Sequence, residues 1–379
     1  MKKLTDICDI QYGYAFDSKK FTEDNSYPPI VRIRDIKRGF SETYYSGEYP
    51  KQYVLHAGDL LVGMDGEFNI ARWKDVDALL NQRVCKLTAK EGTNEEYLRF
   101  AMIKSLKAIE DKTAFVTVKH LSAKELNKLE LNVPSFREQD NVAKILTKLE
   151  KLILLREEEL KSLDKIIKAR FVEMFGDVKI NPHNYKKFSI KSVLKSCEAG
   201  WSGNGTQRIR KDDEIAVLKV SAVTKGYFIP EECKVLDDQE NIKKYVIPEK
   251  GDLLFSRANT REMVGATAIV KEDYPSLILP DKLWKIKFKD NVNVIYMKYI
   301  LSSKSVRHQF SAVSTGTSGS MYNVSMDKFK GIEIPIPPIE LQNQFADFVR
   351  AVDKSKVAVQ RALDETQLLF DSLMQKYFG

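Results

Sequence analysis

The chain has 379 residues, 43% of them hydrophobic, and a formal net charge of +8 with a pI near 9.0. This length predicts two or three domains with real cores, and the positive charge is compatible with a polyanionic partner without requiring one. No stretch reaches the length of a membrane-spanning helix, acidic residues interrupt the segment after Met1 that begins like a signal peptide, and the cysteines lack metal or disulfide spacing. We therefore expect a cytoplasmic protein with reduced thiols and no membrane partner.

The first part of the chain is predicted to mix strands and helices. Residues 30–36, 59–63 and 83–88 are rich in Val, Ile and Leu, which predicts strands. Residues 95–109 place apolar side chains on one face of a helix, and 129–133 read as a final strand. This order predicts a compact mixed unit of about 130 to 150 residues, an ordinary domain size.

A long helix is predicted next. After Pro134 there is no Pro or Gly until Gly176, and apolar residues recur at seven-residue intervals, as in a coiled-coil seam with polar interruptions. At about 1.5 Å per residue such a helix spans about 58 Å, which is longer than a small domain is wide. The predicted seam of this helix consists of Leu146, Ile153, Leu160, Ile167 and Met174.

The rest of the chain repeats the first part. Residues at an offset of 203 match without a gap through the helical segment: Pro134, Gln139, Phe175 and Gly176 recur as Pro337, Gln342, Phe378 and Gly379. Upstream, Gly58–Leu61 recurs as Gly251–Leu254 at an offset of 193, so the offset changes in loops. The repeat predicts strands at 216–223, 252–256, 283–288 and 331–336, a helix at 294–303, and a second seam that includes Val349, Leu363 and Phe370.

The duplication predicts the domain organisation. The fold class is α/β (α+β), with a first domain at 1–136, a helix at 137–178, a second domain at 183–337 and a last helix at 338–379. A pseudo-two-fold axis between the copies would make the two long helices pair antiparallel. The alternative is two separate amphipathic helices, each packed on its own domain.

No catalytic, cofactor-binding or metal-binding motif is recognisable. The chain lacks the Asp/Asn-Pro-Pro-Tyr/Phe motif that grips a target adenine in amino-methyltransferases, and it lacks a Walker loop. Its four histidines have no zinc-like spacing. We therefore predict no catalytic residue, cofactor or metal in this chain.

Polar and aromatic loop residues remain as candidates for reading DNA, although each could equally belong to a solvated turn. Met64–Asn69 and Ser256–Arg261 follow equivalent strands, and the first set is acidic and amide-bearing whereas the second is basic. Such side chains can hydrogen-bond to base edges. The candidate base contacts are Met64, Asp65, Glu67, Asn69, Arg72 and Gln82, followed by Trp201, Asn204, Ser221, Arg257, Asn259, Arg261, Ser320 and Tyr322. The candidate phosphate contacts are Arg32, Arg34, Lys37, Arg38, Lys219 and Lys225, of which Arg32 and Arg34 could instead lie on a strand face away from DNA.

Five segments, in this order and within this duplication, carry a resemblance to a known family. They are Gly58–Asn69, Leu80–Val84, Lys168–Asp177, Gly316–Val324 and Ile334–Glu340. Together they make the whole chain resemble the specificity (S) subunit of type I restriction-modification systems. The second copy departs from the family pattern, because Ser256–Arg261 replaces Met64–Gly66 and Pro280–Lys282 replaces Asn81–Arg83, so its base contacts are harder to assign.

The resemblance implies a function and a set of partners. Each repeat would be a target recognition domain followed by a conserved helix, and each domain would read one half of a split site in double-stranded DNA. The antiparallel helices would set the distance between the domains. Two methyltransferase (M) subunits, which carry S-adenosylmethionine, would dock on this subunit, and restriction (R) subunits would add cleavage driven by ATP and Mg²⁺. The missing catalytic motifs would then belong to these partners.

Two other functions compete with this interpretation. The chain could be a scaffold with two binding domains on a coiled coil and no affinity for DNA. It could also be a fused DNA-modifying enzyme whose motifs are unrecognised, although the absent motifs argue against this.

Overall fold

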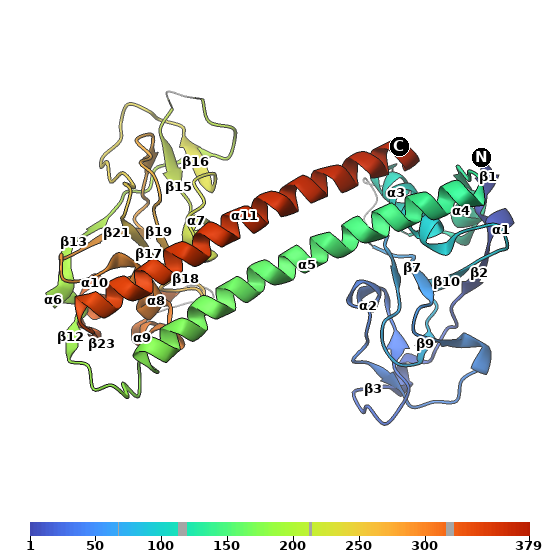
Figure 1. Ribbon diagram of the computed structural model, residues 1–379, viewed down its shortest axis with the longest axis horizontal. Coiled ribbons are helices and arrows are strands. Elements are labelled where there is room, and N and C mark those ends of the chain that lie inside the picture. The colour runs from blue at the N-terminus through green and yellow to red at the C-terminus, as the bar shows by residue number, and fades with distance from the viewer. Residues whose placement is uncertain (67, 113–119, 212–213, 316–321) are drawn as a thin grey trace. The chain divides into compact units, whose positions relative to one another are not determined.

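The computed structural model describes residues 1–66, 68–112, 120–211, 214–315 and 322–379. The chain forms two compact units, one of Met1–Glu158 with Gln360–Gly379 (unit 1) and one of Glu159–Val359 (unit 2) (Figure 1). Each unit therefore combines one copy of the repeat with the last part of the other copy's long helix. These long helices are α5 (Phe136–Phe175) and α11 (Ile339–Phe378).

Unit 1 is built on an antiparallel sheet. Within the described residues, the sheet has the order β2 (Cys8–Tyr12), β10 (Val84–Ala89), β7 (Leu60–Gly63) and β8 (Ile70–Arg72). Smaller pairings join β4 (Ile30–Val31), β9 (Ala78–Leu80) and β6 (Val54–Leu55), then β3 (Phe21–Thr22) with β5 (Tyr44–Tyr45), and β1 (Lys2–Lys3) with β11 (Glu130–Leu131). Its short helices are α1 (Leu4–Ile7), α2 (Ile33–Arg38), α3 (Glu95–Lys112) and α4 (Ala123–Lys128).

Unit 2 repeats this sheet. The described strands have the order β13 (Leu194–Ala199), β21 (Leu283–Phe288), β17 (Leu253–Ser256) and β19 (Thr267–Ile269). A second sheet joins β14 (Gly205–Thr206), β16 (Cys233–Leu236), β15 (Ala216–Leu218) and β20 (Leu277–Ile278), and pairs form between β18 (Ala258–Asn259) and β22 (Tyr322–Asn323) and between β12 (Lys187–Ser189) and β23 (Glu333–Pro335). The short helices are α6 (Ile190–Val193), α7 (Ser221–Thr224), α8 (Val294–Ser302), α9 (Lys304–Val313) and α10 (Met326–Gly331).

Most predicted strands are confirmed, but several are shorter than predicted, and two of them give way to helices. The predicted strand at 30–36 is wrong beyond Val31, because α2 follows. The Asp35 carboxylate accepts a hydrogen bond from the Arg32 backbone N–H at 3.0 Å, and Gly39 ends the helix with a φ of 79°. These local signals start and stop a short helix and outweigh the β-branched residues within it. The predicted strand at 216–223 is likewise wrong beyond Leu218, because α7 follows.

The repeated Gly-Asp-Leu-Leu segment has a structural role. Gly58 has a φ of 98°, which a residue with a side chain rarely adopts. The Asp59 carboxylate then accepts from the backbone N–H of His56 at 2.9 Å and from Lys86 Nζ on the adjacent strand at 3.2 Å. The second copy repeats these contacts with Gly251, Asp252, Glu249 and Lys285. The motif therefore builds the turn that enters the central strand, β7 or β17.

The long helices pair antiparallel inside each unit. In unit 1, Arg156 of α5 donates through Nη1 to the carbonyl of Ala362 of α11, while Leu146 and Met374 share one core. In unit 2, Lys356 Nζ lies 2.6 Å from Asp164 Oδ1. Contacts that advance along one helix while they retreat along the other define an antiparallel pair, so the predicted antiparallel pairing is confirmed.

The predicted seam residues differ in burial. Leu146, Ile167 and Val349 are buried, whereas Ile153 and Leu160 are half-buried. The half-buried seam residues are thus shielded less than those that pack into a domain core, such as Leu146 and Ile167. The remaining predicted seam residues, which pack against the domain cores or lie half-buried, are Met174, Leu363 and Phe370.

A buried glutamine locks the start of each long helix to its domain. Gln342 Nε2 donates to the carbonyl of Pro337 at 2.8 Å, and its Oε1 accepts from the backbone N–H of Asn293 at 2.9 Å. The first copy repeats this with Gln139, whose amide bonds the carbonyl of Pro134 and the N–H of Asn94. This explains why Pro and Gln recur at one spacing in both copies.

We expect Gln342→Leu to lower the free energy of unfolding of unit 2 by about 2 kcal/mol, because it leaves a buried N–H and a buried carbonyl without partners. Denaturant unfolding measures the loss. Asn343→Ala is the matched control, since Asn343 accepts from Asn293 Nδ2 at an exposed position and should change the free energy by less than about 0.5 kcal/mol. Equal effects of the two substitutions would show that the glutamine does not lock the helix.

Candidate nucleic-acid interface

The end of β7 brings together three segments of unit 1 that are far apart in sequence. Just after the strand, the Met64 backbone N–H donates to the carbonyl of Arg83 at 3.0 Å. The carbonyl of Met64 accepts from the N–H of Leu121 at 2.7 Å. We call this backbone arrangement the strand-end frame.

Three side chains, those of Asp65, Arg83 and His120, interact with one another at the strand-end frame of unit 1. Arg83 Nε lies 3.2 Å from Asp65 Oδ2, and the other oxygen of Asp65 hydrogen-bonds to His120 Nδ1. The Arg83 side chain is 52% exposed and Asp65 is 24% exposed, so the arginine faces solvent while the acid lies beneath it. Sequence reasoning proposed Asp65 but missed Arg83 and His120 as site residues. For Arg83 the available signal was its place in the family segment Leu80–Val84.

Unit 2 has the same strand-end frame. The Arg257 N–H donates to the carbonyl of Lys282 at 3.0 Å, and the Arg257 carbonyl accepts from the N–H of Val324 at 2.9 Å. The three residue pairs that correspond between the copies, 64 with 257, 83 with 282 and 121 with 324, have offsets of 193, 199 and 203. The same backbone hydrogen bonds therefore join, in both units, the loops that the sequence repeat aligns.

The charged group on the second frame is different. Arg257 Nη2 lies 3.1 Å from Asp281 Oδ2, and its Nε donates to the Asp281 carbonyl at 2.9 Å. The hydroxyl of Ser202 also donates to Asp281. Burial raises the pKa of Asp281, but the hydrogen bonds from Ser202 and Arg257 outweigh it and hold that pKa below its ordinary value. Asp281 is therefore a carboxylate that keeps Arg257 in place at neutral pH.

Several predicted residues of the second copy gather at this frame. The backbone N–H of Trp201 donates to the carbonyl of Leu279, two residues before Asp281. The β18–β22 pair places Asn259 opposite Tyr322. Others lie in separate contacts. The side chains of Lys219 and Ser221 both bind Glu232, at 2.7 and 2.5 Å. The backbone carbonyl of Asn204 accepts from the N–H of Asp237. That of Arg261 accepts from the hydroxyl of Ser311.

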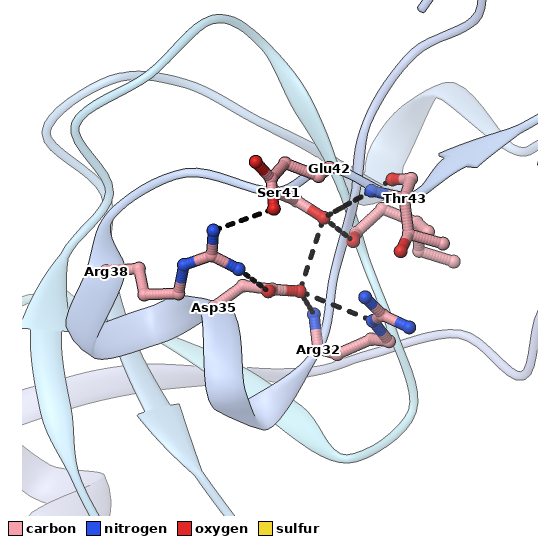
Figure 2. Close-up of polar contacts among 7 residues, drawn as sticks. Arg32, Asp35, Arg38, Ser41, Glu42 and Thr43 are labelled. Atoms are coloured by element: carbon pink, nitrogen blue, oxygen red, sulfur yellow. Dashed lines mark hydrogen bonds and ion pairs between the residues drawn. The ribbon is translucent and has the colours of Figure 1, made fainter. Parts of the chain in front are cut away.

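A polar network orders the basic residues of α2 in unit 1 (Figure 2). Asp35 is fully buried and lies 3.4 Å from Arg32 Nε and 3.7 Å from Arg38 Nη1, and it accepts from the Ser41 hydroxyl at 3.2 Å. Arg38 also binds Glu42 at 2.8 Å and lies over the Phe40 ring. One buried carboxylate therefore orients two half-exposed guanidinium groups.

Helix α2 lies beside the end of β7 that leads to Asp65. A methyl group added at Gly63 would come within 3.2 and 3.3 Å of Ile33 and Ile36 of this helix. Arg34 and Lys37 are exposed on α2. The basic residues predicted as phosphate contacts in the first copy therefore neighbour the strand-end frame, with Arg34, Lys37 and Arg38 on α2 and Arg32 at its N-cap, and not on the strand that was predicted.

The remaining candidates of unit 1 have other surroundings. Arg72 lies opposite Leu60, at the end of β7 away from Asp65, and pairs with Glu95 at 2.8 Å and Glu96 at 2.5 Å. The Met64 side chain is buried in the core, whereas Gln82 is exposed on the turn beside Arg83. The backbone carbonyl of Asn69 accepts a hydrogen bond from the Gly63 N–H at 2.9 Å. Glu67 and Ser320 lie outside the described residues.

The described residues offer little for catalysis. They include no group of three or more His, Cys, Asp or Glu that could hold a metal ion. Burial raises the pKa of Cys8 and of Cys85 to about 12, so these thiols stay protonated and are poor nucleophiles. In the part of the chain that the structure covers, no helix is long and apolar enough to cross a membrane.

Comparison with known proteins gives a consistent result. A sequence model of the type I restriction modification DNA specificity domain matches residues 1–165 and 182–366. The specificity subunit of the Escherichia coli type I restriction enzyme EcoBI is 27% identical over 404 residues, which cover 99% of this chain and 84% of that protein. The specificity subunit of EcoKI from Escherichia coli strain K12 is 27% identical over 207 residues, which cover 51% of this chain and 42% of that protein.

Solved structures share the fold. The S subunit of a type I restriction-modification system from M. genitalium aligns with a TM-score of 0.60 at 12% identity, over 100% of this chain and 95% of that one. Because the family model matches both copies of the repeat, the chain belongs to the family of type I restriction-modification DNA specificity subunits.

Proposed function

We propose that each recognition domain of this specificity subunit reads one half of a bipartite DNA site through its strand-end frame. The observation that carries the proposal is that the two frames have the same backbone hydrogen bonds but different side chains, with Asp65, Arg83 and His120 on one and Arg257, Asp281 and Ser202 on the other. Two readers of different sequences need a common scaffold and dissimilar contacts. The predicted domain limits, 1–136 and 183–337, assign one strand-end frame to each recognition domain.

The proposed partners follow from the same role. Two M subunits would supply S-adenosylmethionine and the methyl transfer, and R subunits would supply ATP- and Mg²⁺-dependent cleavage, in the cytoplasm. Docking is supported by apolar side chains that the long helices expose, such as Leu154 and Leu368 in unit 1 and Val172 and Val357 in unit 2. Exposed apolar residues on an otherwise charged helix favour contact with another protein.

Methylation mapping tests the proposal. The chain would be purified with its co-encoded M subunit, and methylated adenines would be mapped on genomic DNA. We expect a two-part motif with a fixed gap, and no methylation by the chain alone. A continuous motif, or no DNA binding in any combination at low salt, would contradict the proposal.

The helices are proposed to set the gap between the half-sites. Removal of one heptad from both copies, residues 153–159 and 356–362, keeps the seam in register and shortens each helix by about 10 Å. At about 3.4 Å per base pair, the gap should shorten by about three base pairs while both half-sites stay the same. The control, Glu157→Gln with Glu158→Gln, changes the same stretch without changing its length and should preserve the gap. An unaltered gap after the deletion would exclude this role.

Helix α2 is proposed to contact phosphates. Arg32→Gln with Arg38→Gln should weaken binding to all DNA sequences alike and should lower the slope of log affinity against log salt by about 2. Fluorescence anisotropy at several salt concentrations measures both effects. Arg361→Gln is the matched control, because Arg361 also pairs with a glutamate four residues later but lies on α11. A slope that changes equally in both variants would rule out a specific role for α2.

A further inference from the structure

The two strand-end frames place corresponding residues at corresponding points. Asp65 in unit 1 pairs as a β-bridge with His120, and Ala258 in unit 2 pairs with Asn323 at the same position. The turn residues correspond as well, because Arg83 and Lys282 accept equivalent backbone hydrogen bonds. In this correspondence Arg257 matches Met64 and Asp281 matches Gln82, so the charged residues of unit 2 each lie one residue earlier than Asp65 and Arg83.

Each frame holds one arginine–carboxylate pair, and the segment that carries the arginine in one frame carries the carboxylate in the other. In unit 1 the carboxylate, Asp65, follows the central strand and the arginine, Arg83, lies on the turn before β10. In unit 2 the arginine, Arg257, follows the central strand and the carboxylate, Asp281, lies on the turn before β21. The ion pairs are similar in length, 3.2 and 3.1 Å.

A carboxylate that binds one edge of a guanidinium leaves the other edge oriented and available. Asp65 binds Nε of Arg83, and Arg83 Nη1 makes a long contact of 3.5 Å with His120 Nδ1. Among the described contacts the Nη1 of Arg257 makes no hydrogen bond. Arginine binds O6 and N7 of guanine with two parallel N–H donors, and loss of side-chain freedom before binding favours this geometry. Lysine in the same place would offer only a point charge.

We propose that Arg83 and Arg257 each read a guanine, one in each half-site, and that Asp65 and Asp281 are their positioning residues. This rests on the proposed reading of half-sites by the strand-end frames. Arg83 lies on the turn before β10 and Arg257 follows β17 directly, so the two arginines lie on different segments of the common frame. The guanine is therefore expected at different positions within the two half-sites.

The test compares methylation motifs of complexes that contain variant specificity subunits. Arg83→Ala should reduce the preference for guanine over other bases at one position of the first half-site by about 5- to 150-fold. The second half-site should stay unchanged. Arg257→Ala should do the reverse. Arg83→Lys should lose most of the preference as well, because it lacks the second donor. Asp65→Asn should keep the same preferred base with a smaller preference.

Controls separate this inference from the function on which it rests. Arg208→Ala removes an exposed arginine that also pairs with a carboxylate, Glu214 at 2.6 Å, outside both frames, and should relax no base. If a variant fails to methylate, competition binding with oligonucleotides that carry each base in turn replaces the methylation readout. A two-part wild-type motif that both arginine variants leave unrelaxed would overturn the inference alone. Absence of a two-part wild-type motif would overturn the proposed function itself.

Discussion

Replacement of Phe345 by alanine is expected to lower the free energy of unfolding of unit 2 by about 4 kcal/mol. Phe345 is fully buried near the start of α11, and its ring lies 5.4 Å from that of Phe171, 5.6 Å from Phe175 and 5.2 Å from Tyr299. These partners belong to α5 and α8, so the substitution removes the side chain that joins both long helices to the second domain. Aromatic pairs add about 0.5 to 1.5 kcal/mol each to the stabilisation from burial.

Hydrogen exchange resolved by peptide measures this effect in each unit separately. We expect faster exchange in α8 and in the last turns of α5, with no change in unit 1. Val357→Ala, also on α11 but 64% exposed, is the control and should cost less than about 0.5 kcal/mol. A loss below about 1 kcal/mol for Phe345→Ala would mean that the aromatic cluster does not hold this junction.

Arg99→Met is expected to destabilise unit 1 by about 3 kcal/mol at neutral pH. Arg99 is 10% exposed and donates to both oxygens of Glu150 on α5, at 3.0 and 2.7 Å, and to Glu96 at 2.8 Å. Without it, Glu150 loses its cation and Glu96 keeps only Arg72. Glu150 is partly exposed, so solvent screening keeps the cost at the lower end of the range for broken buried ion pairs.

This destabilisation should depend on pH. Burial raises the pKa of Glu96, but hydrogen bonds and charges from Arg99 and Arg72 outweigh it and hold the pKa below its ordinary value. A carboxyl group with a lowered folded-state pKa stabilises the fold above its unfolded pKa of about 4.3, and this contribution is lost as the pH falls through the folded-state value. The difference between wild type and Arg99→Met should therefore shrink below about pH 4. Urea titrations at pH 7 and at about pH 3.5 measure it.

The second copy supplies the control for Arg99. The offsets of the repeat place Lys298 where Arg99 stands and Asp353 where Glu150 stands, and no ion pair within 4 Å links these two residues in the described part of unit 2. Burial lowers the pKa of Lys298. Lys298→Met should therefore change the free energy of unfolding by less than about 1 kcal/mol. Equal losses in both copies would show that packing, and not the ion pair, stabilises α3 on α5.

Local signals in the sequence predicted much of the fold. The strand at 283–288 and both long helices were found from apolar patterns and from the absence of Pro and Gly, because such patterns depend on residues close in the chain. The prediction failed at 32–36, where Ile33 and Ile36 suggested a strand. There the cap formed by Asp35 and the left-handed Gly39 decided for a short helix.

The candidate site was only partly predictable. The sequence showed that Met64–Asn69 and Ser256–Arg261 are equivalent loops with different chemistry. It did not show that His120 meets Asp65 or that Ser202 and Arg257 meet Asp281, because these contacts join segments separated by long stretches of chain. Backbone hydrogen bonds at the ends of β7 and β17 bring them together, and such pairing leaves no periodic trace in the sequence.

The sequence by itself determined that the chain is duplicated, that its helical segment has one length in both copies, and that its reading loops differ. The tertiary structure decided which residues share a frame, and that the segment after the central strand carries the carboxylate in one frame and the arginine in the other. The physical reason is how far apart in the chain the interacting residues lie. A helix or a turn follows from neighbouring residues, whereas the arginine–carboxylate pairs exist only because sheet register places three distant segments within hydrogen-bonding distance.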